Sequence, residues 1–188
     1  MKNNRKICVV GAGRWGMNHV RTLHELGALG GVVETNSEMI RLIQTEFKDI
    51  EYFRNLDDAF NYGFRGFTVA TPAETHYDIA RKIIKNGTHL LVEKPITLNK
   101  TDAISLHKLA IENKVNLMVG HVLLFHPAFE KIKDLIDDGT LGDLQYIYSN
   151  RLNLGQVRTE ENVFWSLAPH DISIFQFYTE SFPTAIKA

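Results

Sequence analysis

Short apolar runs alternate with longer amphipathic segments along most of the chain. The runs have the length of buried strands and lie at residues 7–10, 29–33, 67–70, 89–92 and 117–120. Between them, apolar residues recur at helical spacing, which predicts helices over 17–26, 37–47, 74–86 and 101–113, with weaker elements at 52–53 and 56–62. Ser37 is the predicted N-cap of the second helix, and Gly87 ends the third. This alternation is typical of an α/β fold, a doubly wound Rossmann sheet of parallel strands with helices on both faces.

The pattern changes after Gly120. A helix is predicted over 127–137, closed by Gly139, and another over 172–178. Residues 144–154 alternate like one strand of an open sheet, and a further strand begins at residue 183. One long strand and a stub do not make a stable sheet. We therefore expect a first domain over 1–120 and, over 121–188, the start of an α+β open-sheet domain that is incomplete in this chain.

Composition limits which binding partners and which cellular compartment are expected for the chain. The 188 residues carry a net charge of −1, so no electrostatic attraction to nucleic acid or to an anionic membrane is expected. Only four apolar residues follow the basic start "MKNNRK", and no run reaches the length of a membrane span. The lone cysteine, Cys8, lies in an apolar run and is expected to pack in the core. A cytoplasmic protein is predicted.

Three glycines directly after the first predicted strand suggest a dinucleotide site. Gly11, Gly13 and Gly16 form G-x-G-x-x-G at the start of a helix. The first permits a tight turn, the second lets backbone approach a pyrophosphate, and the third lets helix and strand pack closely. The helix N-terminus then offers N–H groups to the phosphates. Such glycines also occur by chance in turns, but here the required strand and helix are both predicted.

The acid that usually accompanies this motif is present. Glu34 lies 18 residues beyond Gly16, after the second predicted strand. Its carboxylate is placed to accept both hydroxyls of the adenosine ribose, although a solvated loop acid is the alternative. Thr35 and Asn36 follow, and no arginine stands beside them to pair a 2′-phosphate. The sequence therefore favours NAD over NADP.

Two further strands end in polar residues at the same predicted edge. One is followed by Thr71-Pro72 in "TPAETH", which His76 closes, and the other by Glu93-Lys94-Pro95. Ligands of such sheets bind outside the carboxyl ends of the strands, so Lys94 is placed to face a nicotinamide and its substrate. Pro95 fixes the backbone there, with a cis bond as one means. The alternative is that Glu93 and Lys94 form a surface pair worth under about 1 kcal/mol.

The motifs "GAGRWG", "TPAETH", "EKP", "GHVLLFHPAF" and "PHD", in this order, resemble the Gfo/Idh/MocA oxidoreductase family. The resemblance implies that Lys94 is catalytic and contacts the cofactor, and that His170 is the histidine of the second domain. It also implies an open sheet that mediates oligomers, so a homo-oligomer is expected of a full-length member and left open here. The residues expected to contact NAD are Gly11, Gly13, Arg14, Trp15, Gly16, Glu34, Thr71, Pro72, His76, Glu93 and Lys94.

A narrower resemblance concerns the substrate. The stretch "SNRLNLGQVRTEENVFWSLAPHDIS" is similar to nucleotide-sugar dehydrogenases that oxidise C3 of UDP-N-acetylhexosaminuronates. Many family members have an aspartate four residues before the histidine, whereas this chain has Ser166. No carboxylate is therefore expected there to tune His170. Asp171 is adjacent in sequence but is expected to point elsewhere on a helix.

The predicted chemistry is hydride transfer from a secondary alcohol of a small sugar or nucleotide sugar. His170 suits the base, because imidazole ordinarily titrates near neutral pH, and Lys94 suits its electrostatic partner; the two roles are exchangeable. Candidate substrate contacts are His121, Arg151, Asn153, Arg158 and Trp165. The alternative for the two arginines is that they lie on a charged, solvated strand face. The alternative for Trp165 is that it packs in the core or forms a pocket wall. No cluster has metal-ligand spacing, so no metal is expected.

Two function classes remain open from the sequence. The first is an NAD-dependent sugar or nucleotide-sugar dehydrogenase. The second is a non-catalytic dinucleotide-binding or regulatory module, which the incomplete second domain would leave without turnover. The presence of both Lys94 and His170 favours the enzyme.

Overall fold

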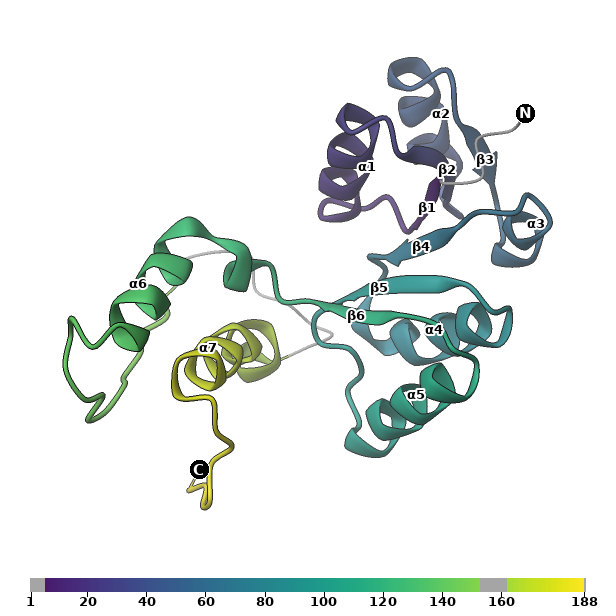
Figure 1. Cartoon of the computed structure of the whole chain (residues 1–188). Helices are drawn as coiled ribbons and strands as arrows, with labels where there is room; N and C mark the ends of the chain where they lie inside the picture. The colour runs from purple at the N-terminus through teal and green to yellow at the C-terminus, as the bar shows by residue number, and fades with distance from the viewer. Residues whose placement is uncertain (1–5, 153–161, 188) are drawn as a thin grey trace. The chain divides into compact units, whose positions relative to one another are not determined.

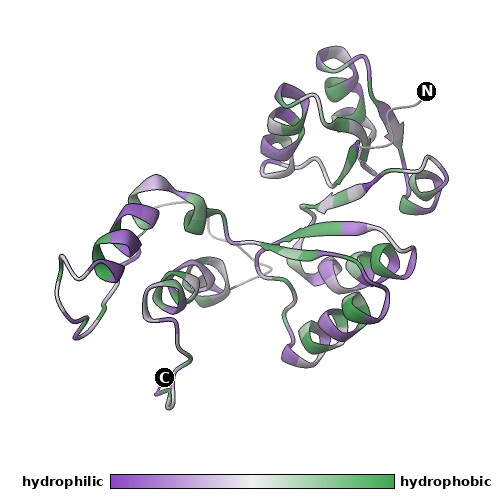
Figure 2. Cartoon of the chain, viewed as in Figure 1, coloured by the Kyte–Doolittle hydropathy of each residue, from purple (hydrophilic) through white to green (hydrophobic). Residues whose placement is uncertain are grey.

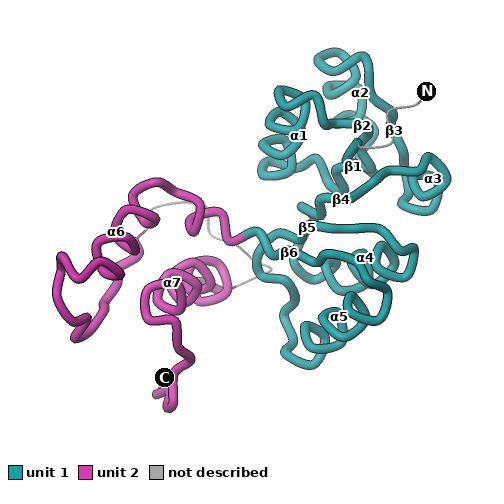
Figure 3. Tube along the Cα trace, viewed as in Figure 1, with its two compact units in different colours: residues 1–120 teal, residues 121–188 magenta. Residues whose placement is uncertain are grey.

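The computed structural model describes residues 6–152 and 162–187. The chain forms two compact units, residues 1–120 and residues 121–188, shown in teal and magenta in Figure 3. Each unit is described by itself.

Unit 1 is a parallel six-stranded sheet with helices between its strands (Figure 1). The strand order is β3-β2-β1-β4-β5-β6, which is the order of a dinucleotide-binding Rossmann sheet. The strands are β1 (Ile7–Val10), β2 (Leu29–Val33), β3 (Glu51–Phe53), β4 (Gly66–Val69), β5 (His89–Glu93) and β6 (Leu117–Gly120). The helices are α1 (Gly16–Glu25), α2 (Ser37–Glu46), α3 (Leu56–Phe60), the 3₁₀ turn η1 (Ala73–Thr75), α4 (His76–Lys85) and α5 (Lys100–Glu112). The predicted α/β fold is confirmed.

Apolar residues fill both faces of this sheet, as expected for buried parallel strands. Along β1, Cys8 and Val10 join a core cluster with residues of α4 and α5, whereas Val9 joins the cluster under α1 and α2. The strands are accordingly apolar along most of their length in Figure 2, and the helices are apolar on one side. Cys8 is fully buried, and burial raises the pKa of its thiol. Its predicted role in core packing is confirmed.

Helix ends follow the expected cap chemistry, with one correction. Asn36, not Ser37, caps α2, because its side-chain oxygen accepts from the backbone N–H groups of Glu38 and Met39. Ser37 is instead the first residue of that helix. Gly87 follows α4 with φ of +71°, the left-handed conformation that a glycine adopts without strain.

Unit 2 consists of the 3₁₀ turn η2 (Val122–Phe125) and the helices α6 (Pro127–Asp137) and α7 (Val163–Thr179) over its described residues. Helix α6 has the predicted bounds, and His126 caps it by accepting from the backbone N–H of Ala128. The predicted helix 172–178 is part of the longer α7, which contains Pro169 and is capped by Asn162. Its start was missed because Pro169 reads as a helix breaker.

The predicted strands of unit 2 are not formed in its described part. Residues 144–152 of the predicted strand 144–154, and residues 183–187 of the next one, have no regular secondary structure. A strand needs a hydrogen-bonded neighbour, and the described residues of this unit provide none. The alternation of apolar and polar residues over 144–152 therefore predicted a strand, but the described residues of this unit provide no neighbouring strand to pair with it.

Candidate functional site

The carboxyl ends of the parallel strands in unit 1 gather polar residues at one edge. Gly11 follows β1, Glu34 follows β2, and Thr71 comes shortly after β4. Lys94 directly follows β5. The order of the sheet changes direction between β1 and β4, which is where ligands of such folds bind.

The three motif glycines have different surroundings. Gly11 has φ of +86°, and a Cβ there would lie 2.7 Å from Cγ2 of Thr71. A Cβ on Gly16 would lie 2.0 Å from the carbonyl oxygen of Gly11, so only glycine permits this packing. A Cβ on Gly13 would meet nothing within 4 Å. The loop is therefore tightly packed at its two ends and open at its centre, as a cradle for a pyrophosphate requires.

The start of α1 has the polarity that suits an anion. No described side chain caps this helix, and its first turn has no acidic residue. Helix N-termini of this kind offer backbone N–H groups and a partial positive charge. Arg14 and Trp15, which were expected to contact the cofactor, are both exposed in the loop just before the helix.

Glu34 holds the glycine loop against the end of β2. Its Oε2 accepts the backbone N–H of Ala12 at 2.8 Å. Its Oε1 accepts the N–H groups of Thr35 at 2.8 Å and Asn36 at 2.9 Å. The carboxylate is half-buried. It lies where the sequence placed it, and it also organises the loop before any ribose is bound.

His76 joins the loops that follow β4 and β5. Its Nδ1 lies 2.8 Å from the carbonyl oxygen of Pro95, and its Nε2 lies 2.9 Å from that of Thr71. The side chain is 1% exposed, so it is enclosed by protein. It was expected among the cofactor contacts, but this geometry indicates that it sets the spacing of Thr71 and Pro95. Pro72, next to Thr71, is exposed.

The end of β5 carries a buried acid followed by a half-buried lysine. Glu93 is 7% exposed, and its Oε1 lies 2.7 Å from Nε2 of His19. Burial raises the pKa of this carboxyl, but hydrogen bonds from His19, from the Trp15 side chain and from the backbone of Lys94 outweigh it, so the pKa is lowered overall. The Lys94–Pro95 peptide bond is cis. Glu93 and Lys94 therefore do not form an exposed surface pair.

Two residues of this edge were not singled out from the sequence. His19 binds Glu93, and Gly120 lies so close to the carboxylate of Glu93 that an added Cβ would be 3.0 Å from its atoms. One signal for His19 was available, because it lies one helical turn beyond Gly16 and hence on the same face of α1. Nothing in the sequence signals the role of Gly120, since it depends on how β5 and β6 pair.

His170 lies on α7 in unit 2, next to a bidentate ion pair. Arg151 donates to Asp171 through Nε at 2.7 Å and through Nη2 at 2.9 Å, and Ser149 donates to the same carboxylate at 2.7 Å. The Arg151 side chain lowers the pKa of the Asp171 carboxyl. Asp171 thus pairs with Arg151, and the guanidinium group of this candidate substrate contact is engaged within the protein. Ser166 lies one turn before His170 on the same helix.

The remaining candidate substrate contacts differ in how they are placed. His121 lines a hollow of about 340 Å³ together with Leu124, Ser173, Gln176, Phe177 and Glu180. Trp165 is exposed near the start of α7, so the core alternative does not hold, and the pocket-wall alternative and the substrate contact stay predictions. Asn153 and Arg158 lie outside the described residues.

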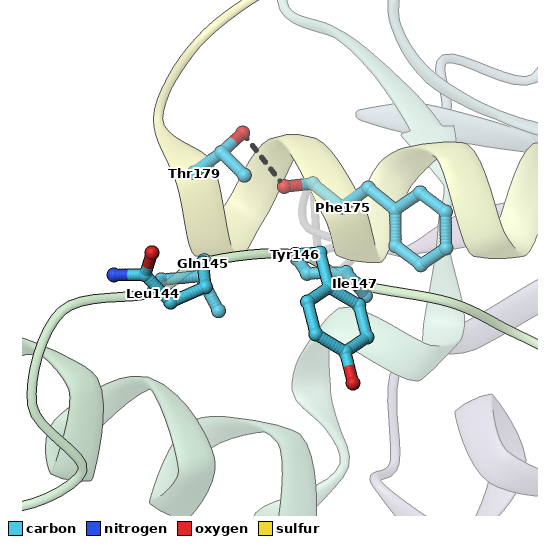
Figure 4. Close-up of a pocket in the computed structure, with 6 residues that line it drawn as sticks. All are labelled: Leu144, Gln145, Tyr146, Ile147, Phe175 and Thr179. Carbon is cyan, nitrogen blue, oxygen red and sulfur yellow. Dashed lines mark hydrogen bonds between the residues drawn. The ribbon is translucent and has the colours of Figure 1, made fainter.

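A second hollow in unit 2 is lined by uncharged residues. It encloses about 270 Å³ between residues 144–147 and α7 (Figure 4). Its lining consists of Leu144, Gln145, Tyr146, Ile147, Phe175 and Thr179, and the Thr179 hydroxyl donates to the backbone carbonyl of Phe175. The hollow therefore provides no charged group to hold an anion.

Two kinds of feature are absent from the described residues. No three His, Cys, Asp or Glu side chains of residues 6–152 and 162–187 gather closely enough to hold a metal ion. In the same ranges, no helix has the length and apolar character needed to cross a membrane.

Comparison with known proteins agrees with this geometry. Residues 5–121 match GFO_IDH_MocA, described as "Oxidoreductase family, NAD-binding Rossmann fold". The UDP-N-acetylglucosamine 3-dehydrogenase of Acidithiobacillus ferrooxidans is 27% identical over 181 residues, covering 96% of this chain and 56% of that protein. The scyllo-inositol 2-dehydrogenase (NAD(+)) of Bacillus subtilis is 25% identical over 189 residues, covering 94% and 54%.

A solved structure adds evidence on the cofactor. The crystal structure of GenD2 from gentamicin A biosynthesis, in complex with NAD, superposes with a TM-score of 0.68 at 32% identity, over 72% of this chain and 39% of GenD2. The chain spans about half the length of the curated relatives it matches. Unit 1 is thus an NAD-binding Rossmann domain with the edge residues described above.

Proposed function

The chain belongs to the Gfo/Idh/MocA oxidoreductase family. On that premise we propose that it functions as an NAD-dependent dehydrogenase, which acts on a secondary alcohol of a sugar or nucleotide sugar. One observation carries the proposal. The open glycine loop, the acid after β2 and the lysine after β5 all lie at the carboxyl edge of a single sheet. A cofactor-binding loop and a cationic side chain at one edge are the parts that hydride transfer needs.

The residues of unit 1 fit NAD. The open space at Gly13 admits a pyrophosphate close to the backbone, beside the uncapped start of α1. Glu34 is anchored by three backbone N–H groups and is proposed to accept the adenosine ribose hydroxyls through its remaining acceptor positions. Thr71 and Lys94 are proposed to border the nicotinamide half. When bound, NAD supplies the hydride acceptor.

Lys94 and His170 are the proposed catalytic residues. An ammonium group at the end of β5 can donate a hydrogen bond to an alcohol oxygen and stabilise the alkoxide that forms as the C–H bond breaks. Imidazole can accept the hydroxyl proton, and the chemistry of this residue type and the family resemblance support His170 as that base. The two residues belong to different units, so the role of Lys94 is tested by itself.

The substrate class rests on the named relatives. They include a UDP-N-acetylglucosamine 3-dehydrogenase and inositol 2-dehydrogenases, all of which act on ring alcohols by their names. We propose a cyclic polyol or sugar, with a UDP-N-acetylhexosamine or its uronate as the first candidate. Since Arg151 is paired with Asp171, a substrate carboxylate must compete for that arginine or find another partner.

The test has two steps, binding and turnover. NAD is titrated into the chain by calorimetry, and NAD reduction is then followed with myo-inositol, scyllo-inositol, UDP-N-acetylglucosamine and its uronate. We expect NAD binding and reduction with at least one of these alcohols. NAD binding without reduction by any alcohol in the panel would favour the non-catalytic binding module instead. Absence of NAD binding would contradict both.

A further inference from the structure

A buried carboxylate links the glycine loop to the strand that presents Lys94. Glu93 is the last residue of β5, and its side chain lies against Gly120 of the neighbouring strand β6. An added Cβ on Gly120 would be 3.0 Å from Cδ and from both oxygens of this carboxylate. The carboxylate therefore occupies the space that a side chain at position 120 would need.

A side chain of α1 holds this carboxylate. Nε2 of His19 lies 2.7 Å from Oε1. The Trp15 side chain acts in the same direction, because it helps to lower the pKa of the Glu93 carboxyl. Trp15 and His19 are four positions apart, which puts them on one face at the start of α1.

The reach of α1 to β5 depends on the glycine loop. A Cβ on Gly16 would lie 3.5 Å from Cβ of Ala70, so the helix passes close to the end of β4, which lies between β1 and β5. From there, His19 reaches Glu93 on the next strand. The same glycine that permits close packing at the loop thus allows the contact with the strand before Lys94.

The contacts are strong enough to fix the local structure. A carboxylate that is 7% exposed would be costly without donors, and the pKa of Glu93 is lowered because the donors outweigh the effect of burial. Its Oε2 also lies 3.3 Å from the backbone nitrogen of Lys94. On the other side of Lys94, the carbonyl of Pro95 is held by His76. The backbone of Lys94 is therefore held from both directions.

We infer that Glu93 is a positioning residue, which joins the start of α1, directly after the glycine loop, through His19 to the backbone that presents Lys94. The importance of Glu93 for positioning Lys94 rests on the proposed function. Its effect on the conformation of the glycine loop concerns NAD binding alone. In this account Glu93 does not contact NAD. It keeps the loop that receives the pyrophosphate in its binding conformation, so that loss of the His19 contact reduces the fraction of chains ready to bind.

Two amide substitutions at position 19 test this inference. In His19→Gln, the amide nitrogen is as many bonds from Cα as Nε2 of histidine and can still donate to Glu93. In His19→Asn, the amide is one bond shorter and cannot reach. The two variants have similar polarity and differ in reach. His24→Asn, at an exposed position of the same helix, is the matched control.

NAD affinity of the three variants is measured by calorimetry, with circular dichroism to verify folding. We expect about a tenfold loss for His19→Asn and less than about a threefold change for His19→Gln and His24→Asn, because apparent affinity scales with the competent fraction. Equal affinities of folded His19→Asn and His19→Gln would overturn the inference. If His19→Asn does not fold, His19→Phe keeps a ring of similar size and removes the nitrogen that contacts Glu93, and unchanged NAD affinity in that folded variant would overturn the inference as well.

The proposed function fails in a different way. A chain that binds NAD but reduces it with no alcohol would overturn the dehydrogenase proposal, and the affinity comparison at position 19 would still decide whether Glu93 positions the loop.

Discussion

Nδ1 of His76 lies 2.8 Å from the carbonyl oxygen of Pro95, although the two residues belong to loops that follow different strands. The other ring nitrogen contacts the carbonyl of Thr71 at 2.9 Å. One buried side chain thus sets the distance between the loop after β4 and the loop that carries Lys94. This contact makes His76 part of the framework of the site.

Replacing His76 should therefore cost stability as well as NAD affinity. In His76→Leu the two carbonyls lose the ring nitrogens that lie against them. A neutral imidazole donates to one of them, and leaving that carbonyl unsatisfied costs about 1–3 kcal/mol. Urea denaturation should show this loss of unfolding free energy. His107→Leu, at an exposed position of α5, is the control and should change it by less than about 0.5 kcal/mol. Equal stabilities of the two variants would show that the His76 contacts contribute little.

The motif glycines should separate folding from binding. Gly16→Ala places a Cβ 2.0 Å from the carbonyl oxygen of Gly11, so we expect a loss of about 1–3 kcal/mol in stability. Gly13→Val meets no protein atom within 4 Å of its Cβ, so the chain should fold, but the side chain would occupy the space proposed for the pyrophosphate. NAD affinity should then fall by about tenfold or more. Thermal melts and NAD titrations of both variants measure the two effects, and normal NAD affinity in Gly13→Val would exclude this loop as the cradle.

Glu34 should give the chain its preference between the two nicotinamide cofactors. A carboxylate accepts ribose hydroxyls and repels a 2′-phosphate, so NAD should bind at least about tenfold more tightly than NADP. Glu34→Gln removes the negative charge and keeps one acceptor oxygen, which can serve either the backbone N–H of Ala12 or those of Thr35 and Asn36. This variant should bind the two cofactors with affinities within about threefold. Calorimetric titrations with NAD and NADP provide the test, and an unsubstituted chain without preference would remove the role given to Glu34.

The sequence was informative where function depends on local chemistry. Gly11, Gly13, Gly16 and Glu34 were identifiable because a turn, a helix start and a strand end each impose their own residue types. The edge position of Lys94 followed from the rule that parallel strands end together. These features need only the order of elements along the chain.

The parts that escaped prediction depend on contacts between distant segments. His19 and Glu93 are 74 positions apart, and no local pattern states that α1 reaches β5. The partner of Asp171 was not predicted either, because Arg151 lies 20 positions earlier in the chain. The strand predicted at 144–154 failed for a related reason. Alternating apolar and polar residues favour a strand, but a strand also needs a hydrogen-bonded neighbour, which local sequence does not reveal.

The lowered pKa of Glu93 gives its stability contribution a defined pH dependence. A carboxyl whose pKa is lower in the folded chain stabilises it above the unfolded value of about 4.3, and this contribution is lost as pH falls through the folded-state pKa. The unfolding free energy should therefore decrease more steeply below about pH 4.3 in the unsubstituted chain than in Glu93→Gln. Urea denaturation between about pH 3 and pH 7 measures both profiles. Parallel profiles would mean that the His19 and Trp15 contacts do not favour the charged form.

The central claim is that Lys94 acts on the reacting alcohol at the end of β5. Lys94→Met keeps the bulk of the side chain and removes its charge, and Lys85→Met, at an exposed position of α4, is the control. Both are compared by their kcat for NAD reduction on a verified sugar substrate and by their NAD affinity, in a form of the protein that turns over. We predict that Lys94→Met lowers kcat by about 10²–10³-fold, the scale of removing one oxyanion donor, while NAD affinity changes by less than about threefold. Near-normal kcat in Lys94→Met would contradict the account and leave the Glu93-Lys94-Pro95 element with a structural role only.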